Sequence, residues 1–223
     1  MLNLLRSGDF KMILIYIIAV LLSLSIHEMA HALASYWLGD ATAKYRGRIS
    51  LNPFHHIDWT GFACLLLFGF GWAQPVPINP YEYKNPKLGT AWSAFAGPLA
   101  NFVLAFVCIF CFDLLAIFAR NFVMTSFGSF LISLLSTTAL MSTGFGVFNL
   151  IPIPPLDGAK VFWSFLPDRY YFRLNNPPAW ITLAFFVLIA SGLFIDPLNL
   201  MRSTLVGWMD DGALWLIQLL FIH

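Results

Sequence analysis

The sequence has few charged residues. Lys, Arg, Asp and Glu make up only 10% of its 223 residues, whereas hydrophobic residues make up 59%. A soluble domain typically carries about 25% charged residues, so the composition excludes most soluble globular proteins and indicates an integral membrane protein. The net charge of +1 lacks the strong positive excess of nucleic-acid-binding chains, so no nucleic-acid partner is expected.

Cysteine is also scarce. The three cysteines, Cys64, Cys108 and Cys111, all lie in apolar runs, and their odd number argues against a disulfide framework. Cys108 and Cys111 form a C-x-x-C pattern, but no polar neighbour would activate either thiol. We therefore expect these cysteines to pack within the membrane-embedded part of the protein.

Long apolar runs, by contrast, are abundant. A membrane-spanning helix needs about 20 mostly apolar residues. The runs that qualify are 12–38, 91–119 and 127–150, with a shorter one at 180–195. The run 198–222 carries Asp210 and Asp211 in its middle, so it is either a fifth span or a bent or interfacial segment. Residues 62–72 are too few to span and predict a re-entrant or interfacial element.

Two loops interrupt the apolar runs. Residues 40–60 alternate polar and apolar side chains around 44–51, which predicts a short β-hairpin. Residues 73–88 hold four prolines and predict an extended segment. The expected fold is an all-α polytopic membrane protein with about five to six transmembrane helices, a short β-hairpin and a re-entrant or extended loop near the active site.

The expected domain organisation is one transmembrane domain over residues 1–223, with a core at about 10–165 and C-terminal helices at about 179–223. The first apolar run continues past Ala32-Leu33-Ala34, so we expect it to stay as a helix and not to be removed as a signal peptide. Eight of the twelve Lys and Arg residues lie in the loops 39–90 and 151–178. The positive-inside rule then predicts a multi-pass protein of the inner or plasma membrane whose active site faces the cytosol.

The first apolar run contains an H-E-x-x-H pattern formed by His27, Glu28 and His31. A charged side chain within hydrocarbon costs at least about 2.5 kcal/mol, so it usually marks a functional site. Histidines four residues apart share one helix face and can bind the same metal ion, while the adjacent glutamate can act as a general base toward a metal-held water. The alternative is that both histidines only form hydrogen bonds with neighbouring helices.

A catalytic zinc site normally has three protein ligands. The candidates for the third are His55, His56, Glu82, Asp113 and Asp157. Asp113 lies near the far end of its apolar run, which disfavours it. Asp157 follows the third run on the side of the histidines, where the prolines of I-P-I-P-P prevent a helix and let the chain fold back. Spacing alone leaves loop hydrogen bonding as an equal alternative for Asp157.

Three separated motifs together resemble the site-2 protease family of intramembrane zinc metalloproteases, in a minimal form without a PDZ or other appended domain. They are H-E-M-A-H at 27–31, A-G-P-L-A-N at 96–101 and F-N-L-I-P-I-P-P-L-D-G at 148–158. The loops at 47–61 and 71–80 are also similar, and the resemblance covers about residues 20–165. It implies that His27, His31 and Asp157 bind one Zn²⁺ and that Glu28 is the general base. Ala159 stands where many relatives have a second glycine, a change that removes no ligand.

The same resemblance suggests roles for three further polar residues, each with an alternative. Asn149 matches a polar position near the metal, where an amide can stabilise an oxyanion or hold a substrate carbonyl, or can simply bond the end of its helix. Asn101 can hydrogen-bond the first helix or the substrate, while Gly97 and Pro98 beside it suit close helix packing. His56 matches the family's single loop histidine better than His55. It either polarises the substrate carbonyl, contacts a metal ligand from outside, or lies at the surface.

The implied activity is that of a zinc metalloendopeptidase that cleaves a peptide bond in or near a transmembrane segment of a membrane-protein substrate, as in regulated intramembrane proteolysis. The partners expected are that substrate, the lipid bilayer and a regulatory membrane protein. A transporter or metal sensor would show polar residues along a path through the membrane, whereas here they gather at one end. A catalytically silent relative would lack Glu28 or a ligand, and all four residues are present.

Overall fold

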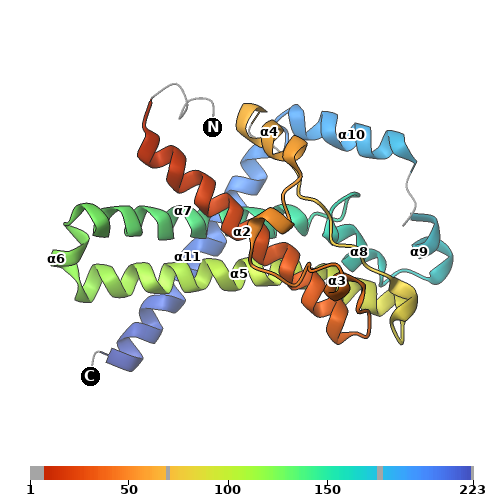
Figure 1. Ribbon diagram of the computed structural model, residues 1–223, viewed down its shortest axis with the longest axis horizontal. Coiled ribbons are helices and arrows are strands. Elements are labelled where there is room, and N and C mark those ends of the chain that lie inside the picture. Colours follow the sequence, from red (N-terminus) through yellow and green to blue (C-terminus); the bar gives the residue numbers. More distant parts are fainter. Residues whose placement is uncertain (1–7, 69–70, 175–177, 222–223) are drawn as a thin grey trace.

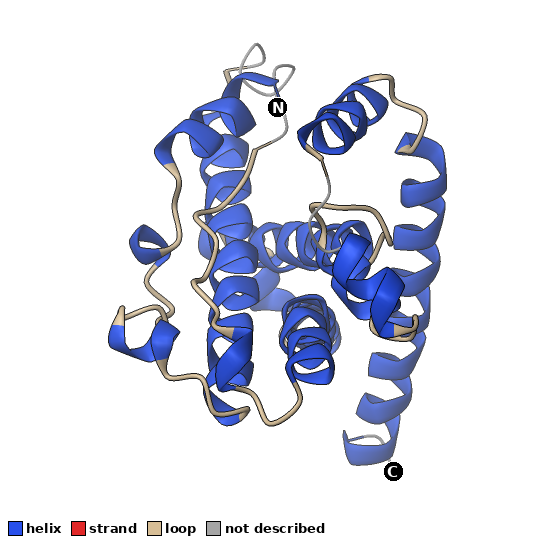
Figure 2. Ribbon diagram, turned by 90° about the vertical axis from the view of Figure 1, so that its right-hand side faces the viewer, coloured by secondary structure: helices blue, strands red, loops and turns tan. Residues whose placement is uncertain are grey.

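Helices dominate the structure, a computed structural model that describes residues 8–68, 71–174 and 178–221 (Figure 2). Within these ranges, the only isolated β pairing is an antiparallel bridge between Ile57 and Ala73. The helical prediction is therefore confirmed for the part of the chain that is described.

Three of the described helices are long and apolar enough to cross a membrane: α2 (Phe10–Trp37), α5 (Pro86–Phe118) and α7 (Ser126–Asn149). Each begins at a side-chain cap, because the caps accept hydrogen bonds from otherwise unpaired backbone N–H groups. The capping residues are Asp9, Asn85 and Thr125. These helices confirm three of the predicted spans to within a few residues.

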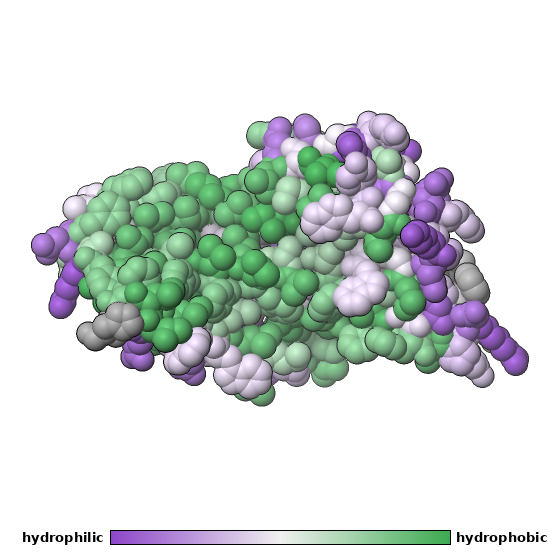
Figure 3. Space-filling view, turned by 90° about the horizontal axis from the view of Figure 1, so that it is seen from below, coloured by the Kyte–Doolittle hydropathy of each residue, from purple (hydrophilic) through white to green (hydrophobic). Residues whose placement is uncertain are grey.

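The long helices form three layers. The antiparallel pair α5 and α7, joined through α6 (Arg120–Val123), lies between α2 on one side and α11 (Ile195–Phe221) on the other, and both outer helices cross the pair obliquely (Figures 1 and 2). Ala213 of α11 packs against Cys108 and Ile109 of α5 and Ala139 of α7. The surface in Figure 3 is apolar along most of the long axis and polar at its two ends, as a bilayer requires.

The predicted number of spans is not confirmed. Helix α10 (Ala179–Ala190) has 12 residues, about 18 Å of helix, which is too short for a hydrocarbon core of about 30 Å. Helix α11 has 27 residues and is long enough. It is, however, not among the helices apolar enough to be candidate spans. Its charged side chains are Asp196, Arg202, Asp210 and Asp211.

The β-hairpin predicted within 40–60 is wrong. This segment contains helix α3 (Thr42–Tyr45) and the short 3₁₀ helix η1 (Pro53–His55). The carboxylate of Asp40 accepts a hydrogen bond from Thr42 N at 2.8 Å, which starts a helical turn directly after α2. Pro53 fixes the backbone at the first position of η1. Local capping thus overrides the alternating polar pattern.

The remaining loop predictions are closer to the structure. Helix α4 (Trp59–Phe68) occupies most of the segment predicted as re-entrant or interfacial, of which residues 69 and 70 lie outside the described residues. Residues 73–79 form no helix, as their prolines predicted, and lead into the 3₁₀ helix η2 (Pro80–Glu82). Gln74 N donates to the carbonyl of His56 at 2.9 Å, so this segment runs beside the end of η1.

Candidate metal centre

The two histidines of α2 meet one aspartate from α8 (Asp157–Trp163). Nε2 of His31 lies 3.0 Å from Nε2 of His27 and 3.1 Å from Oδ2 of Asp157, and His27 Nε2 lies 3.2 Å from the same oxygen. Ligands bonded to a tetrahedral zinc ion at about 2.0 Å would be about 3.3 Å apart. The triangle of donor atoms therefore fits a zinc ion after movements of a few tenths of an ångström.

Hydrogen bonding at His31 favours a cation in this triangle. Its Nδ1 lies 2.7 Å from the backbone carbonyl of Ser93 on α5. A carbonyl only accepts, so Nδ1 carries the proton and a neutral His31 presents the lone pair of Nε2. That lone pair faces a carboxylate oxygen, which is also an acceptor. Two acceptors this close need a proton or a metal ion between them, and a metal ion would at the same time bind both histidines.

His27 has an outer partner of its own. Its Nδ1 lies 3.2 Å from the side-chain amide of Asn101, a fully buried residue of α5 whose Oδ1 has no hydrogen-bond partner in the described residues. Exchanging the amide N and O would let Oδ1 accept a proton from Nδ1 and leave Nε2 free for a metal. Ser142 of α7 donates to the backbone carbonyl of Asn101 at 2.9 Å, so this residue connects all three long helices.

The chain after α7 folds back to deliver Asp157. Residues 150–156 are turns and bends that contain three prolines, and α8 begins at Asp157 itself. A Cβ at Gly158 would lie 2.5 Å from the carbonyl oxygen of Ile151, so only glycine lets α8 start against this turn. Asp157 is buried and its Oδ2 lies within 3.2 Å of both histidine Nε2 atoms, so its carboxylate is in position to act as the third ligand.

Gly97 allows α5 to approach the histidines. A Cβ at this position would lie 2.7 Å from Cε1 of His27 and would also overlap the ring of His31. Pro98 follows within the same helix and, lacking an N–H, leaves the carbonyl of Ala94 without its helical hydrogen bond. The A-G-P sequence thus lets α5 lie directly against the ligand face of α2.

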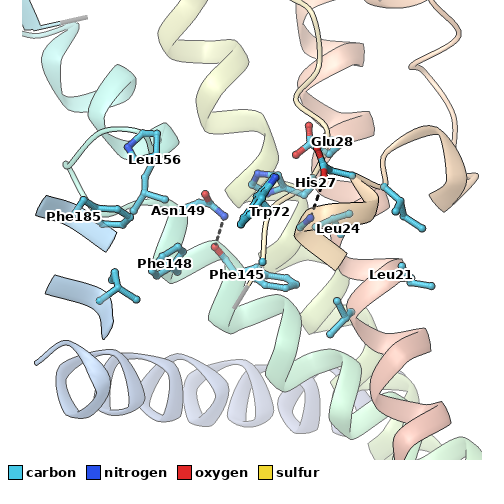
Figure 4. A pocket seen from close by; sticks show the side chains of 18 residues that line it. Leu21, Leu24, His27, Glu28, Trp72, Phe145, Phe148, Asn149, Leu156 and Phe185 are labelled. Carbon is cyan, nitrogen blue, oxygen red and sulfur yellow. Dashed lines mark hydrogen bonds between the residues drawn. The ribbon is translucent and has the colours of Figure 1, made fainter. Parts of the chain in front are cut away.

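Two cavities, each of about 430 Å³, meet beside the histidines. The first, called here the apolar cavity, lies between α2, α7 and α10 (Figure 4), with walls that include Leu21, Leu24, Trp72, Phe145, Phe148 and Phe185. The second, called here the polar cavity, is lined by groups that include His31, Thr90, Asp157 and Lys160. His27, Glu28 and Asn149 line both. Glu28 therefore stands where an apolar chamber and a polar chamber join.

Asn149 and the loop histidines occupy different settings. Nδ2 of Asn149 donates to the carbonyl of Phe145 at 3.0 Å, which is the helix-end bond expected as one alternative, yet its amide also borders both cavities (Figure 4). His56 is fully buried, with Nε2 2.8 Å from the carbonyl of Ser50. His55 contacts the carbonyl of Gly47 at 3.0 Å. Neither of these histidines lines either of the two cavities, and His56 is not the surface residue that one alternative predicted.

The other two candidates for the third ligand lie elsewhere. Glu82 belongs to η2, where Nδ2 of Asn79 approaches it at 3.4 Å. Asp113 lies near the α6 end of α5, away from the histidines, and interacts electrostatically with Asp210 of α11. Among the described residues, His27, His31 and Asp157 form the only cluster able to hold a metal.

Sequence reasoning missed two neighbours of the ligands. Ser93 acts through its backbone carbonyl, which no side-chain pattern can reveal. Lys160 has a signal in the sequence, because a residue three positions after Asp157 shares its face when both lie on a helix. That helix could not be predicted from a stretch so rich in proline.

Comparisons with known proteins agree with this geometry. Residues 113–191 match Peptidase family M50. The chain is 34% identical over 183 residues to "Putative zinc metalloprotease YwhC" of Bacillus subtilis, an alignment that covers 82% of this chain and 81% of that protein. Two further relatives are also designated putative zinc metalloproteases. Rip2 of Mycobacterium tuberculosis is 28% identical, in an alignment that covers 96% of this chain and 75% of that protein. MJ0611 of Methanocaldococcus jannaschii is 32% identical, in an alignment that covers 68% of this chain and 71% of that protein. No solved structure matches the chain significantly.

The three apolar helices, the buried ligand triangle and these relatives define a zinc metalloprotease of the membrane. The relative from Bacillus subtilis is 34% identical over 81% of its length, and this similarity establishes the family of the chain. The chain belongs to peptidase family M50, the site-2 proteases.

Proposed function

We propose that this protein is an intramembrane metalloendopeptidase that cleaves a peptide bond in or near a transmembrane segment of another membrane protein. The observation that carries the proposal is the position of Glu28, which follows the ligand His27 on α2 and lines both cavities. A base beside the metal ligands has access to water from the polar cavity and to a substrate in the apolar one.

In this proposal His27, His31 and Asp157 hold Zn²⁺, for which their donor atoms are already arranged. When bound, zinc supplies Lewis-acid polarisation of the scissile carbonyl and lowers the pKa of water toward about 7. Glu28 takes the proton of the attacking water and passes it to the leaving amine. The second N–H of the Asn149 amide, which the bond to Phe145 does not use, donates to the oxygen of the substrate carbonyl.

The substrate enters the apolar cavity as a locally unwound segment. A transmembrane helix hides its peptide bonds in its own hydrogen bonds, so it must unwind before cleavage. The structure has a helix where the hairpin was predicted, so the hairpin cannot receive the substrate. The extended segment 73–79 can instead pair with the unwound substrate through its backbone N–H and C=O groups. Ala73 and Trp72 already border the cavity.

This edge is testable by sequence replacement. Exchanging residues 75–78 for Gly-Ser-Gly-Ser should abolish cleavage of a membrane substrate while the zinc content stays at one per chain, because the ligands lie on α2 and α8. Unchanged cleavage by this variant would remove the edge-pairing step from the proposal.

Orientation and partners follow the charge distribution. The loops 39–90 and 151–178 carry eight of the twelve Lys and Arg residues, so we place them, and the metal centre between them, on the cytosolic side. Regulated release of membrane-anchored proteins would suit this placement. The partners would then be a transmembrane substrate, the surrounding lipid and a regulatory membrane protein.

The central experiment measures zinc and proteolysis together in mild detergent. Wild type and Glu28→Gln should each hold about one zinc per chain, whereas Asp157→Ala should lose it. Only wild type should cleave a co-reconstituted transmembrane substrate, and Glu28→Gln should be slower by at least about 100-fold. A wild-type protein that stays free of zinc after reloading, or a Glu28→Gln variant with full activity, would overturn the proposal.

A further inference from the structure

The charges around the metal centre are unbalanced. Of the described residues that line the two cavities, Glu28, Asp58 and Asp157 are acidic, and Lys160 is the only Lys or Arg. Lys160 lies on α8, one helical turn after Asp157, and lines the polar cavity. A single cation in this position has a specific effect on the ligand beside it.

The two oxygens of Asp157 face different groups. Oδ2 lies within 3.2 Å of both histidine Nε2 atoms, whereas Oδ1 lies 3.7 Å from Nζ of Lys160. The carboxylate side chain is 12% exposed and that of Lys160 is 44% exposed. The ammonium group therefore reaches from the polar cavity to an oxygen that is otherwise shielded from water.

We propose that Lys160 is a positioning residue for Asp157: it holds Oδ1, so that the carboxylate presents Oδ2 alone to the metal. This inference rests on the proposed function, since it takes His27, His31 and Asp157 as the zinc ligands. It gives each ligand an outer partner, because Asn101 faces Nδ1 of His27 and the Ser93 carbonyl faces Nδ1 of His31.

The chemical consequence concerns the number of bonds that Asp157 makes. A carboxylate can bind a metal through one oxygen or through two. Binding through two would crowd the position that a catalytic zinc site must keep open for water or substrate. A cation on Oδ1 competes with the metal for that oxygen and keeps the carboxylate in one orientation. Lys160 thereby preserves the open position facing Glu28.

The test compares variants of one lysine on purified full-length protein. Lys160→Met removes the charge but keeps an unbranched side chain, and Lys160→Arg restores the charge. Lys87→Met is the matched control, because Lys87 makes an ion pair with Asp168 at 2.9 Å and lines neither cavity. Zinc affinity is measured by competition with a chelating dye, and the zinc–oxygen shell by X-ray absorption.

Lys160→Met should show a longer and more populated zinc–oxygen shell than wild type and should bind zinc at least about 10-fold more tightly, because the site loses a neighbouring positive charge and Oδ1 becomes free to bind the metal. Lys160→Arg and Lys87→Met should stay within about 3-fold of wild type. Equal affinity and an unchanged oxygen shell in Lys160→Met would overturn the inference while leaving the zinc site intact. Absence of zinc from wild type would instead overturn the proposed function.

Should Lys160→Met fold poorly, Lys160→Gln provides the same charge removal with a polar side chain. Its zinc–oxygen shell should change in the same direction. A shell identical to that of wild type in a well-folded Lys160→Gln protein would equally contradict the positioning role.

Discussion

Single residues position this metal centre through contacts that are not themselves ligands. Gly97, Asn101 and the Ser93 carbonyl all come from one stretch of α5 and all touch the histidines of α2. Because a metal site tolerates little displacement of its donors, small changes at such neighbours should alter metal binding without removing a ligand.

Gly97→Ala tests this directly. The new methyl group would overlap the rings of His27 and His31, so α5 must move away and the ligands must shift. We expect zinc affinity to fall by at least about 10-fold, measured by dye competition. Gly207→Ala is the control, because a Cβ there meets nothing within 4 Å. Full zinc affinity in Gly97→Ala would show that the helices have room that the structure does not indicate.

Asp40 fixes the loop that leads to the extended segment 73–79. It is fully buried, and its carboxylate accepts hydrogen bonds from Ser35 Oγ at 2.9 Å and from the backbone N–H groups of Thr42 at 2.8 Å and Asn79 at 2.7 Å. Burial would raise the pKa of Asp40, but the bonds from Thr42, Asn79 and Ser35 together lower it. The folded state therefore favours the carboxylate more than the unfolded chain does.

The pH dependence follows from that direction. A lowered folded-state pKa contributes stability that is complete above the unfolded pKa of about 3.9 and is lost as the pH falls through the folded value. Asp40→Asn should therefore cost about 2 kcal/mol at pH 7. The difference from wild type should shrink below about pH 4 in thermal unfolding of the zinc-free proteins. A difference that stays constant down to pH 3 would contradict an ionised Asp40.

At the scale of elements, the interface of α5 with α11 contains a polar group that the metal centre does not use. Asp113 of α5 is 7% exposed, and its Oδ2 has no hydrogen-bond partner in the described residues. The nearby carboxylate of Asp210 on α11 adds an unfavourable interaction between like charges. A buried carboxylate in this setting destabilises the contact between the two helices.

Replacing this carboxylate with an amide should therefore stabilise the protein. Asp113→Asn is expected to raise the stability by about 1 kcal/mol or more, seen as a higher melting temperature in detergent. Asp196→Asn, in the exposed first turn of α11, should change the melting temperature much less. A lower melting temperature for Asp113→Asn would mean that the carboxylate has a favourable partner.

At the scale of the whole molecule, both ends of the described chain lie at the α6 end of the α5–α7 pair (Figure 1). Nζ of Lys11 donates to Oγ of Ser129 at 3.0 Å, and the ring of Phe221 lies 5.9 Å from that of Phe118. Because α10 is too short to span, we expect α11 to make the return crossing from the side of the metal centre.

Reporter fusions can check this topology. A phosphatase or fluorescent protein fused after residue 223 should report the side of the α6 turn, and one inserted in the loop between α8 and α9 (Asp168–Leu174) should report the opposite side. The same side for both insertions would mean that α11 does not cross the bilayer, and the protein would then have three spans.

The sequence by itself determined the class of protein, the three apolar spans and the candidate ligands on α2. Hydrophobic runs of sufficient length must cross a bilayer, and residues spaced four apart must share a helix face. It also singled out Asp157, although only through a resemblance, because the fold-back of a proline-rich turn is not encoded in any local period. The hairpin at 40–60 was wrong because capping by Asp40 starts a helical turn there, and the fourth span is not confirmed because α10 ends at Ala190.

Only the tertiary structure decided which groups surround the ligands. The approach of Ser93, Gly97 and Asn101 to the histidines depends on how α5 crosses α2, and the contact of Lys160 with Asp157 depends on α8 starting at its ligand. The contacts of α5 with the histidines join residues more than 60 positions apart, and the contact of Lys160 with Asp157 exists only because a helix begins there. Their role is fixed by packing, which no single stretch of sequence contains.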